Sequence, residues 1–361
     1  MQLIRRCLPR MGLASFVARR ALILTLTLML SVYMTVVIAN FGGYIDKILK
    51  DQITFDVTTA LSRDPNFAKL PEAEKQRLIE QKIEARIRAA GLDKPFLERS
   101  LIQFTQALTL NLGRAMFLRS ASGSKAIADI IMERLPRTVL LFTLGTIAAA
   151  IIGIFLGLVQ AQKALSKFDR LMIVFEIFTY VQPAWFYGIL FILIFSFYLR
   201  IFPSGGMVSI PAPTEPIAYT LDVLYHLALP LITWIFASFG YWAYTTRNIV
   251  LQTMGEDFVT AAKAKGLPDR IILWRYVLRP SSPPIITGVA FAIVFSWTGA
   301  IITETVFNWP GIGLLFWEAI VALDAPVIIG LTVILAYMIV LTVLILDIIY
   351  GILDPRLRVM R

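Results

Sequence analysis

Apolar residues gather along the chain in long blocks separated by polar segments. Six of these blocks are long enough to cross about 30 Å of hydrocarbon, for which an α-helix needs about 20 residues. They cover residues 16–40, 136–161, 169–199, 224–247, 283–304 and 326–350. The pattern therefore predicts an all-α polytopic membrane protein with six transmembrane helices.

The largest segment outside these blocks, residues 41–135, is also predicted to be helical. A helix start is indicated at Pro71-Glu72-Ala73-Glu74, and a helix end at Gly91. Asp93-Lys94-Pro95 indicates a second helix, with an apolar stripe formed by Leu97, Leu101, Phe104 and Leu108. We expect this extracytoplasmic segment to pack as a small helical cap; because a stripe does not identify its partner, an unpacked helical hairpin is the alternative.

Composition agrees with a membrane location. Of the 361 residues, 58% are hydrophobic and 16% are charged, and the mean hydropathy is +0.74, which excludes a soluble domain with a polar surface. The first apolar block is longer than the ~7–15 residues of a signal-peptide core, so we expect it to be a retained anchor. Because the chain has a single cysteine, Cys7, and a single histidine, His226, we expect neither an internal disulfide framework nor a metal site.

The net charge of +10 could indicate a nucleic-acid partner, but basic residues of a membrane protein must first be sorted by side. With the N-terminus inside, seventeen of the 34 lysine and arginine residues fall on the cytoplasmic side, and the two short outer loops hold only Arg200. The other sixteen lie in residues 41–137; long translocated segments are largely exempt from the rule, and only four of these residues are near membrane ends. The distribution predicts that the tails, residues 1–15 and 351–361, are cytoplasmic in a cell-membrane protein, and no nucleic-acid partner is expected.

Two of the predicted spans carry patterns that modify helix packing. Gly153 and Gly157 form a small-xxx-small pattern, which lets helices approach closely in lipid. Gln182-Pro183 interrupts the third span, and a proline within a helix leaves a backbone carbonyl without its usual partner. We therefore expect a kink at this point.

Residues 255–280 form a basic amphipathic stretch within the polar segment 248–282, between two apolar blocks. Residues 256–265 predict a short helix ended by Gly266, and residues 271–278 predict a second helix with one apolar side. Such a helix can dock into a groove on another subunit, or it can lie flat on anionic lipid. Spacing alone leaves both interpretations open.

The sequence DFVTAAKAKGLPDRIILWRYVLR, residues 257–279, resembles the EAA loop of binding-protein-dependent ABC transporter permeases of the oligopeptide/dipeptide branch. Further motifs of this family occur in the same order along the chain: Gly91-Leu-Asp-Lys-Pro95, Asn111-Leu-Gly113, Leu135-Pro-Arg-Thr138, Phe202-Pro-Ser-Gly-Gly206, His226-Leu-Ala-Leu-Pro230, Glu304-Thr-Val-Phe-Asn-Trp-Pro-Gly-Ile-Gly313 and Leu353-Asp-Pro-Arg356. The resemblance runs from about residue 90 to the C-terminus and includes the first apolar block.

This resemblance implies the type I permease fold of ABC importers, in which the 255–280 loop docks on an ATPase subunit. It assigns the contact to Asp257, Thr260, Ala261, Ala262, Lys265, Gly266, Leu267 and Trp274. Thr260 stands where the family motif usually has glutamate, which puts in doubt any contact that needs a carboxylate there.

The resemblance also implies several partners: a second homologous permease, two ATPase subunits and an external solute-binding protein. The surfaces that could meet the binding protein are residues 41–135 and the loops 200–223 and 305–326. The chain lacks the phosphate-binding pattern G-x-x-x-x-G-K-[ST]. We therefore expect a transport subunit rather than an enzyme, with ATP and magnesium bound by the partner ATPases.

Polar residues inside the predicted spans indicate where the translocation path could run, because ionisable groups are costly in lipid and tend to face a cavity. Glu176 and Glu304 are such residues, and Gln182 and Trp185 follow Glu176 in the same span. We expect these four residues to line the path. The alternative is that the carboxylates make hydrogen bonds between neighbouring helices.

Together these patterns predict a permease subunit of an ATP-driven importer whose solute is a peptide, with oligosaccharides or nickel as alternative cargoes of the same machinery. Two other classes of membrane protein would need features of their own. An intramembrane enzyme needs a set of polar catalytic residues meeting in the bilayer, and a stand-alone channel or carrier is expected to show inverted repeats or paired broken spans. The sequence supports neither.

Overall fold

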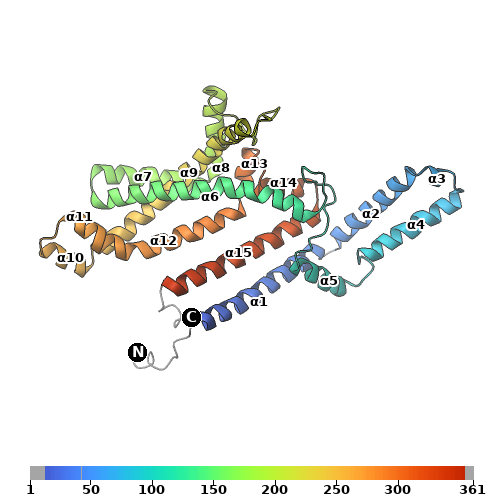
Figure 1. Ribbon diagram of the computed structural model, residues 1–361, viewed down its shortest axis with the longest axis horizontal. Coiled ribbons are helices and arrows are strands. Elements are labelled where there is room, and N and C mark those ends of the chain that lie inside the picture. The colour runs from blue at the N-terminus through green and yellow to red at the C-terminus, as the bar shows by residue number, and fades with distance from the viewer. Residues whose placement is uncertain (1–12, 42, 354–361) are drawn as a thin grey trace. The chain divides into compact units, whose positions relative to one another are not determined.

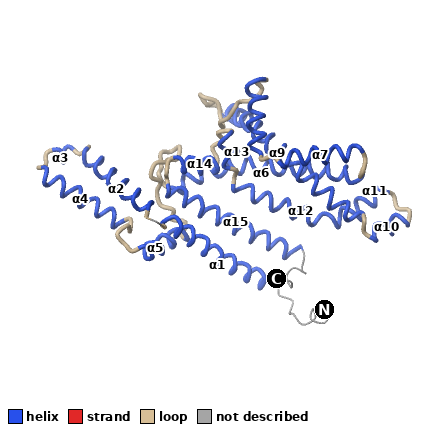
Figure 2. Tube along the Cα trace, turned by 180° about the vertical axis from the view of Figure 1, so that it is seen from behind, coloured by secondary structure: helices blue, strands red, loops and turns tan. Residues whose placement is uncertain are grey.

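The computed structural model describes residues 13–41 and 43–353. The predicted N-terminal tail up to residue 12, with Cys7, and the end of the chain from Asp354 lie outside the described residues. Figure 2 shows the described chain as helices joined by loops, without strands. Its contacts define two compact units: the core unit, Met132–Glu318, and the flanking unit, which comprises the described residues up to Ile131 and from Ala319 onward.

Within the described residues, five helices are long and apolar enough to cross a membrane: Ala14–Asn40, Ile127–Gln162, Pro216–Met254, Asp269–Thr298 and Ala325–Ile349. A sixth crossing is present if the pair Lys167–Val181 and Ala184–Tyr198, bent by 94°, counts as one span. The all-α membrane class is thus confirmed, and the break lies at Gln182-Pro183 as expected. Gln182 has extended backbone angles, because a following proline disfavours the helical conformation.

In the flanking unit, α1 (Leu13–Asn40) packs along α15 (Ala325–Leu353) and also contacts α5 (Phe96–Leu108), as can be followed in Figure 1. The apolar cluster between them contains Leu28, Val32, Val36, Ala107 and Val333. Arg20 of α1 forms an ion pair with Asp347 of α15 at 2.7 Å. This unit therefore joins the first and last long helices of the chain.

The 41–135 segment begins with α2 (Tyr44–Ser62) and α3 (Pro65–Ala68), which the sequence patterns did not reveal. The helices expected after Pro71 and Pro95 are present as α4 (Glu72–Ala89) and α5, and Gly91 has a left-handed φ of 68°. In α5, however, Leu97 and Leu101 are exposed, whereas Phe104 and Leu108 pack against the α1–α15 cluster. The expected stripe is therefore only half buried.

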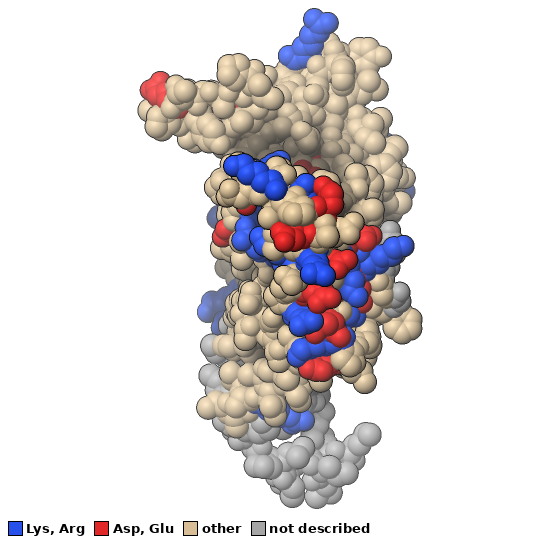
Figure 3. Space-filling model, turned by 90° about the vertical axis from the view of Figure 1, so that its right-hand side faces the viewer, with Lys and Arg blue, Asp and Glu red and all other residues tan. Residues whose placement is uncertain are grey.

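Helix α4 lies against α2 but has no buried residue. It carries acidic and basic side chains along its length, and Figure 3 shows both signs of charge intermixed on the face turned toward the viewer. One side of α4 carries the half-buried apolar residues Leu78, Ile79, Ile83 and Ile87 at helical spacing, and its exposed side carries charge pairs such as Arg88 with Glu84 at 3.1 Å.

The core unit is built around α9 (Pro216–Met254), which α7, α8, α10 and α12 all contact. In chain order its other elements are α6 (Ile127–Gln162, whose first residues belong to the flanking unit), α7 (Lys167–Val181), α8 (Ala184–Phe191), the π-helix η2 (Ile192–Tyr198), α10 (Asp257–Ala264), α11 (Asp269–Ile271), the π-helix η3 (Ile272–Val277), α12 (Leu278–Phe295), the 3₁₀ turn η4 (Ser296–Thr298), α13 (Ile301–Val306) and most of α14 (Ile312–Val321).

Glycines let α6 and α7 approach α9 closely. A Cβ at Gly153 would lie 2.5 Å from the carbonyl oxygen of Phe239, and one at Gly157 would lie 2.5 Å from that of Ala243. Gly240 of α9 meets the backbone of α7 in the same way, with 2.5 Å to the carbonyl oxygen of Glu176. These separations are too short for any larger residue, so the close approach expected from the small-xxx-small pattern is confirmed.

The helix Asp269–Thr298, which is the fifth long helix when the bent pair is counted as the third, differs from the predicted span 283–304 at both ends. It begins at Asp269 and runs through η3 and α12 to Thr298, so the helix expected over residues 271–278 is its first part rather than a separate element. Ile272 and Val277 are buried there, and this packing holds the polar segment in a continuous helix. Gly299, with a φ of 72°, ends the helix, and Glu304 therefore lies beyond it on α13.

Candidate functional site

The 255–280 loop folds into a helical hairpin at the end of α9. Helix α10 begins after Glu256, whose backbone is extended, and it ends at Ala264. Gly266 follows with a φ of 72°, and its N–H donates to the carbonyl of Lys263 at 2.9 Å. A left-handed glycine at this position is a common helix terminator, so the short helix and its glycine stop are confirmed.

One face of α10 is anchored in the core unit. Val259 and Ala262 are 0% and 3% exposed. They pack in a cluster with buried residues from three other elements: Ala161 of α6, Val250 of α9, and Ile272 and Val277 of η3. Because several helices pack against this face, a displacement of α10 would also displace α6, α9 and the start of the fifth long helix.

The opposite face of α10 is open. Asp257, Thr260 and Ala261 are exposed at i, i+3 and i+4 spacing, which places them on one side of the helix. Lys265 and Gly266 are exposed at its end. The hairpin thus presents a short polar ridge, with small side chains at its centre.

Of the other residues assigned to the loop contact, Leu267 is half-buried and packs against the α10 cluster. Trp274 on η3 is 63% exposed. The structure therefore brings all eight residues onto one hairpin but divides their roles, because Ala262 and Leu267 support the fold while the other six face outward.

A groove of about 480 Å³ opens beside the hairpin. Its lining includes Lys263, Asp269, Arg270 and the indole of Trp274. The groove therefore combines both signs of charge with a large exposed aromatic side chain, and aromatic and arginine side chains are enriched at protein–protein interfaces.

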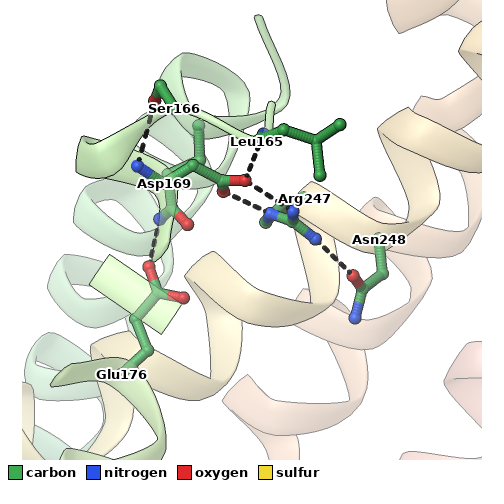
Figure 4. A network of polar contacts seen from close by, with 7 residues as sticks. Leu165, Ser166, Asp169, Glu176, Arg247 and Asn248 are labelled. Atoms are coloured by element: carbon green, nitrogen blue, oxygen red, sulfur yellow. Dashed lines mark hydrogen bonds and ion pairs between the residues drawn. The ribbon is translucent and has the colours of Figure 1, made fainter. Parts of the chain in front are cut away.

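A buried ion pair fastens α7 to α9 close to this hairpin (Figure 4). The Nε and Nη2 atoms of Arg247 donate to the two carboxylate oxygens of Asp169 at 2.5 and 2.7 Å, a bidentate arrangement. Asp169 also accepts from the backbone N–H of Leu165 at 2.9 Å, and Ser166 caps the start of α7. Arg247 precedes Val250 by about one helical turn, so the pair lies next to the cluster that holds α10.

Glu176 is fully buried further along α7, on the same side as Asp169 (Figure 4). The side-chain amide of Gln160 on α6 donates to its Oε1 atom. The Oε2 atom has no hydrogen-bond partner among the described residues. Gln160 directly precedes Ala161 of the α10 cluster, so this contact joins α7 to α6 next to the residues of α6 that support the hairpin.

Glu304 is also fully buried, but it is held by the turn that follows α13. Thr138 of α6 donates to its Oε1 atom at 3.0 Å, and the backbone N–H of Leu314 donates to its Oε2 atom at 3.0 Å. The Thr138 hydroxyl accepts in turn from the N–H of Ile312 at 2.7 Å. Glu304 therefore ties α6 to the start of α14.

The four residues expected to line a path are not brought together. Glu176 and Glu304 make separate interhelical hydrogen bonds, which was the alternative interpretation of each. Gln182 is exposed at the bend between α7 and α8, and Trp185 is half-buried on α8. The described residues place none of the four along the open cleft of the core unit, which is lined by α6, α7, α9, α12 and η4.

Sequence reasoning missed the Asp169–Arg247 pair. A signal for part of it was present, because Ser166 followed three residues later by Asp169 is typical of a helix start. The partner, however, lies 78 residues away on another helix, and no local pattern identifies such a contact.

The helices and the hairpin define the class of the protein: a multi-pass membrane subunit with a helical hairpin available to a partner. The model of the family described as binding-protein-dependent transport system inner membrane component matches residues 139–359, well over half of the chain. The chain belongs to this family. It is a permease component of an ABC transporter, and family membership implies an ATPase partner and a solute-binding protein.

Curated relatives agree with this assignment. A putative peptide permease protein of Brucella suis is 32% identical over 272 residues, covering 74% of this chain and 82% of the relative. The oligopeptide transport system permease protein AppB of Bacillus subtilis is 32% identical over 64% of this chain and 72% of its own length. The dipeptide transport system permease protein DppB of Escherichia coli is 28% identical over 74% of this chain and 83% of its own length.

Proposed function

We propose that this chain is the permease subunit of a peptide importer and that α10 is its contact with the ATPase. The observation that carries the proposal is the two-sided character of α10. Its inner face packs against α6, α9 and η3, while Asp257, Thr260 and Ala261 are exposed on its outer face. A helix built in this way can receive a force from a partner and pass it to the membrane helices.

The outer face of α10 offers a partner the small and polar side chains of Asp257, Thr260 and Ala261, whereas Val259 and Ala262 are used inside the subunit and Phe258 is exposed beside them. This mainly polar surface favours docking on a protein over lying flat on lipid, which needs a large exposed apolar face. Thr260 supplies a hydroxyl where the family motif usually has a carboxylate, so the contact at this position is a hydrogen bond rather than an ion pair.

The proposed cargo is a peptide, because the relatives from three bacteria carry names of peptide, oligopeptide and dipeptide permeases. Oligosaccharides and nickel are the alternatives for the same machinery. The proposed assembly contains a second homologous permease, two ATPase subunits and an external binding protein. Both termini and the 255–280 loop face the cytoplasm in this arrangement, and the 41–135 segment lies outside, in accord with the distribution of lysine and arginine.

The test uses the complete transporter, purified and reconstituted into lipid vesicles with its binding protein. ATP-dependent uptake is measured for radiolabelled trialanine, maltotriose and Ni²⁺. We expect uptake of trialanine alone. Uptake of maltotriose or Ni²⁺ without trialanine would overturn the proposed cargo while leaving the transport role intact.

The ATPase contact is tested by Ala261→Glu, which places a carboxylate at the centre of the exposed ridge without entering the core. We expect the ATPase to be lost on co-purification and uptake to fall to background. Ala85→Glu, an equally exposed alanine on α4, is the matched control and should retain the ATPase. Full retention by Ala261→Glu would contradict the proposed contact. Ala262 is unsuitable for this test because it is buried.

A further inference from the structure

An open cleft of about 470 Å³ lies within the core unit. It is bordered by α6, α7, α9, α12 and η4 and is lined by Thr146, Tyr180, Trp234, Ser238, Tyr241 and Ser296, together with apolar neighbours. The volume falls within the range of about 300–1,000 Å³ that is usual for small-molecule sites. No lysine, arginine, histidine, aspartate or glutamate of the described chain lines it.

The hydroxyl groups of the cleft fall into two sets. Thr146 accepts from the indole N–H of Trp234 at 3.1 Å, and Ser296 is hydrogen-bonded to Thr143 at 2.9 Å. The hydroxyls of Tyr180, Ser238 and Tyr241 have no hydrogen-bond partner among the described residues. The cleft therefore offers a set of donors and acceptors that the fold itself does not use.

Aromatic rings stand beside these hydroxyls. The rings of Tyr180 and Tyr241 meet edge to face, with their centroids 6.5 Å apart, and they are 37% and 52% exposed. Together with Trp234 they provide flat apolar surfaces next to polar groups. Such a lining suits a ligand that carries both amide groups and apolar side chains.

Lipid chains would be poor occupants of this cleft. A hydroxyl that has no partner in hydrocarbon costs free energy, because neither water nor lipid can supply its hydrogen bond. Unpartnered hydroxyls on two facing helices, α7 and α9, indicate a cleft that is filled by water or by a polar solute. The absence of charged residues also removes any strong preference between cationic and anionic side chains of a ligand.

We propose that this cleft binds the transported peptide through its backbone amides and uncharged side chains, with Tyr180, Ser238 and Tyr241 as contacts. The inference rests on the proposed peptide-importer function. It moves the solute-binding surface away from Glu176, Gln182, Trp185 and Glu304 and onto the neutral side chains of α7 and α9. A lining of this kind tolerates peptides of varied sequence.

Cysteine labelling of the complete transporter tests the site. Because the chain has a single native cysteine, Cys7→Ser provides a background for Ser238→Cys and Tyr241→Cys, with Leu171→Cys as a control on an exposed part of α7 outside the cleft. Each variant is treated with a membrane-impermeant thiol reagent with and without trialanine, and labelling is read on this chain after separation from its partners. At a peptide concentration of about ten times its Kd, mass action leaves about one-tenth of the sites free, so labelling should slow about tenfold.

We expect this protection at Ser238→Cys and Tyr241→Cys, and no effect of trialanine on Leu171→Cys. Failure of the hydrophilic reagent to reach either cleft position would overturn the proposal and would indicate a face covered by lipid or by the second permease. Labelling without protection by the peptide would overturn it as well. Uptake of trialanine by the Leu171→Cys transporter is measured in the same preparation, and its absence would overturn the proposed function rather than the cleft alone.

Discussion

The core unit contains two buried polar centres that differ in how their carboxylates are satisfied. The α7–α9 centre comprises Gln160, Asp169, Glu176 and Arg247, and the α13 centre comprises Thr138, Glu304 and the backbone N–H of Leu314. In the α13 centre each oxygen of Glu304 accepts a hydrogen bond from a neutral donor. In the α7–α9 centre Asp169 is paired with a guanidinium, whereas Glu176 has only one of its oxygens bonded.

This difference shows that buried acidic residues in apolar helices can have different structural roles. Glu304 organises the turn between α13 and α14, and Asp169 fastens one helix to another. Glu176 keeps an unused acceptor, so it contributes less to the fold than its burial suggests. Substitutions of Asp169, Glu304 and Glu176 should therefore lower the stability of the protein by different amounts.

The largest effect is expected for Asp169→Asn. This change leaves the largely buried guanidinium of Arg247 without its carboxylate, and breaking a buried ion pair on one side costs about 3–5 kcal/mol. The apparent Tm of the purified transporter in detergent should fall more than for any other variant described here. The double variant Asp169→Leu with Arg247→Met removes both charges and should recover most of the lost stability. If Asp169→Asn alone were as stable as the wild type, the proposal that the ion pair holds α7 to α9 would be contradicted.

A smaller but clear loss is expected for Glu304→Ala. The substitution removes two hydrogen bonds and leaves the N–H of Leu314 unsatisfied in a buried site, at about 1–3 kcal/mol for such a group. The same thermal measurement applies, together with proteolysis in the 309–314 turn, which should become faster. Glu318→Ala is the control in the neighbouring helix, because the Glu318–Arg134 pair at 3.3 Å is partly exposed and worth little. Equal effects of the two variants would contradict the special role of Glu304.

The smallest effect is expected for Glu176→Gln. The glutamine keeps a carbonyl oxygen that can accept from Gln160, and no charge is left without a partner, so the change in stability should stay within about 1 kcal/mol. Uptake of trialanine should be unchanged, because the solute contacts are placed in the cleft of α7 and α9. A loss of uptake with unchanged stability would indicate that Glu176 lines the translocation path. Glu176 would then differ from Glu304 in function as well as in its hydrogen bonds.

Much of the fold could be predicted because it follows from local patterns. Apolar blocks of sufficient length indicated the long helices, Pro183 marked the bend, and Gly266 marked the end of α10. Helix α2 was missed because residues 44–62 mix charged and apolar side chains without a clear start signal. The start of the fifth long helix was misplaced because Arg275 and Arg279 make its first turns look like a loop, although Ile272 and Val277 pack inward.

The α10 contact surface, the partners of the buried carboxylates and the cleft could be predicted only in part from the sequence. Exposure of Thr260 and burial of Ala262 depend on which side of α10 meets α6 and α9, and the family motif lists both positions alike. The partners of Asp169, Glu176 and Glu304 lie on other helices, and the lining of the cleft comes from five elements. Such contacts arise from tertiary packing and have no signature in one stretch of chain.

The 94° bend between Lys167–Val181 and Ala184–Tyr198 also limits how this part of the chain can cross a bilayer. Each arm is about 22 Å long at 1.5 Å per residue, so a single upright arm falls short of a hydrocarbon layer of about 30 Å. If the membrane normal bisects the bend, both arms incline by about 47° and together cover about 30 Å. With the pair inclined in this way the number of crossings would be even, and the 255–280 hairpin would lie on the same side of the membrane as the start of α1. If the two arms instead entered and left on one side, the hairpin would lie on the opposite side.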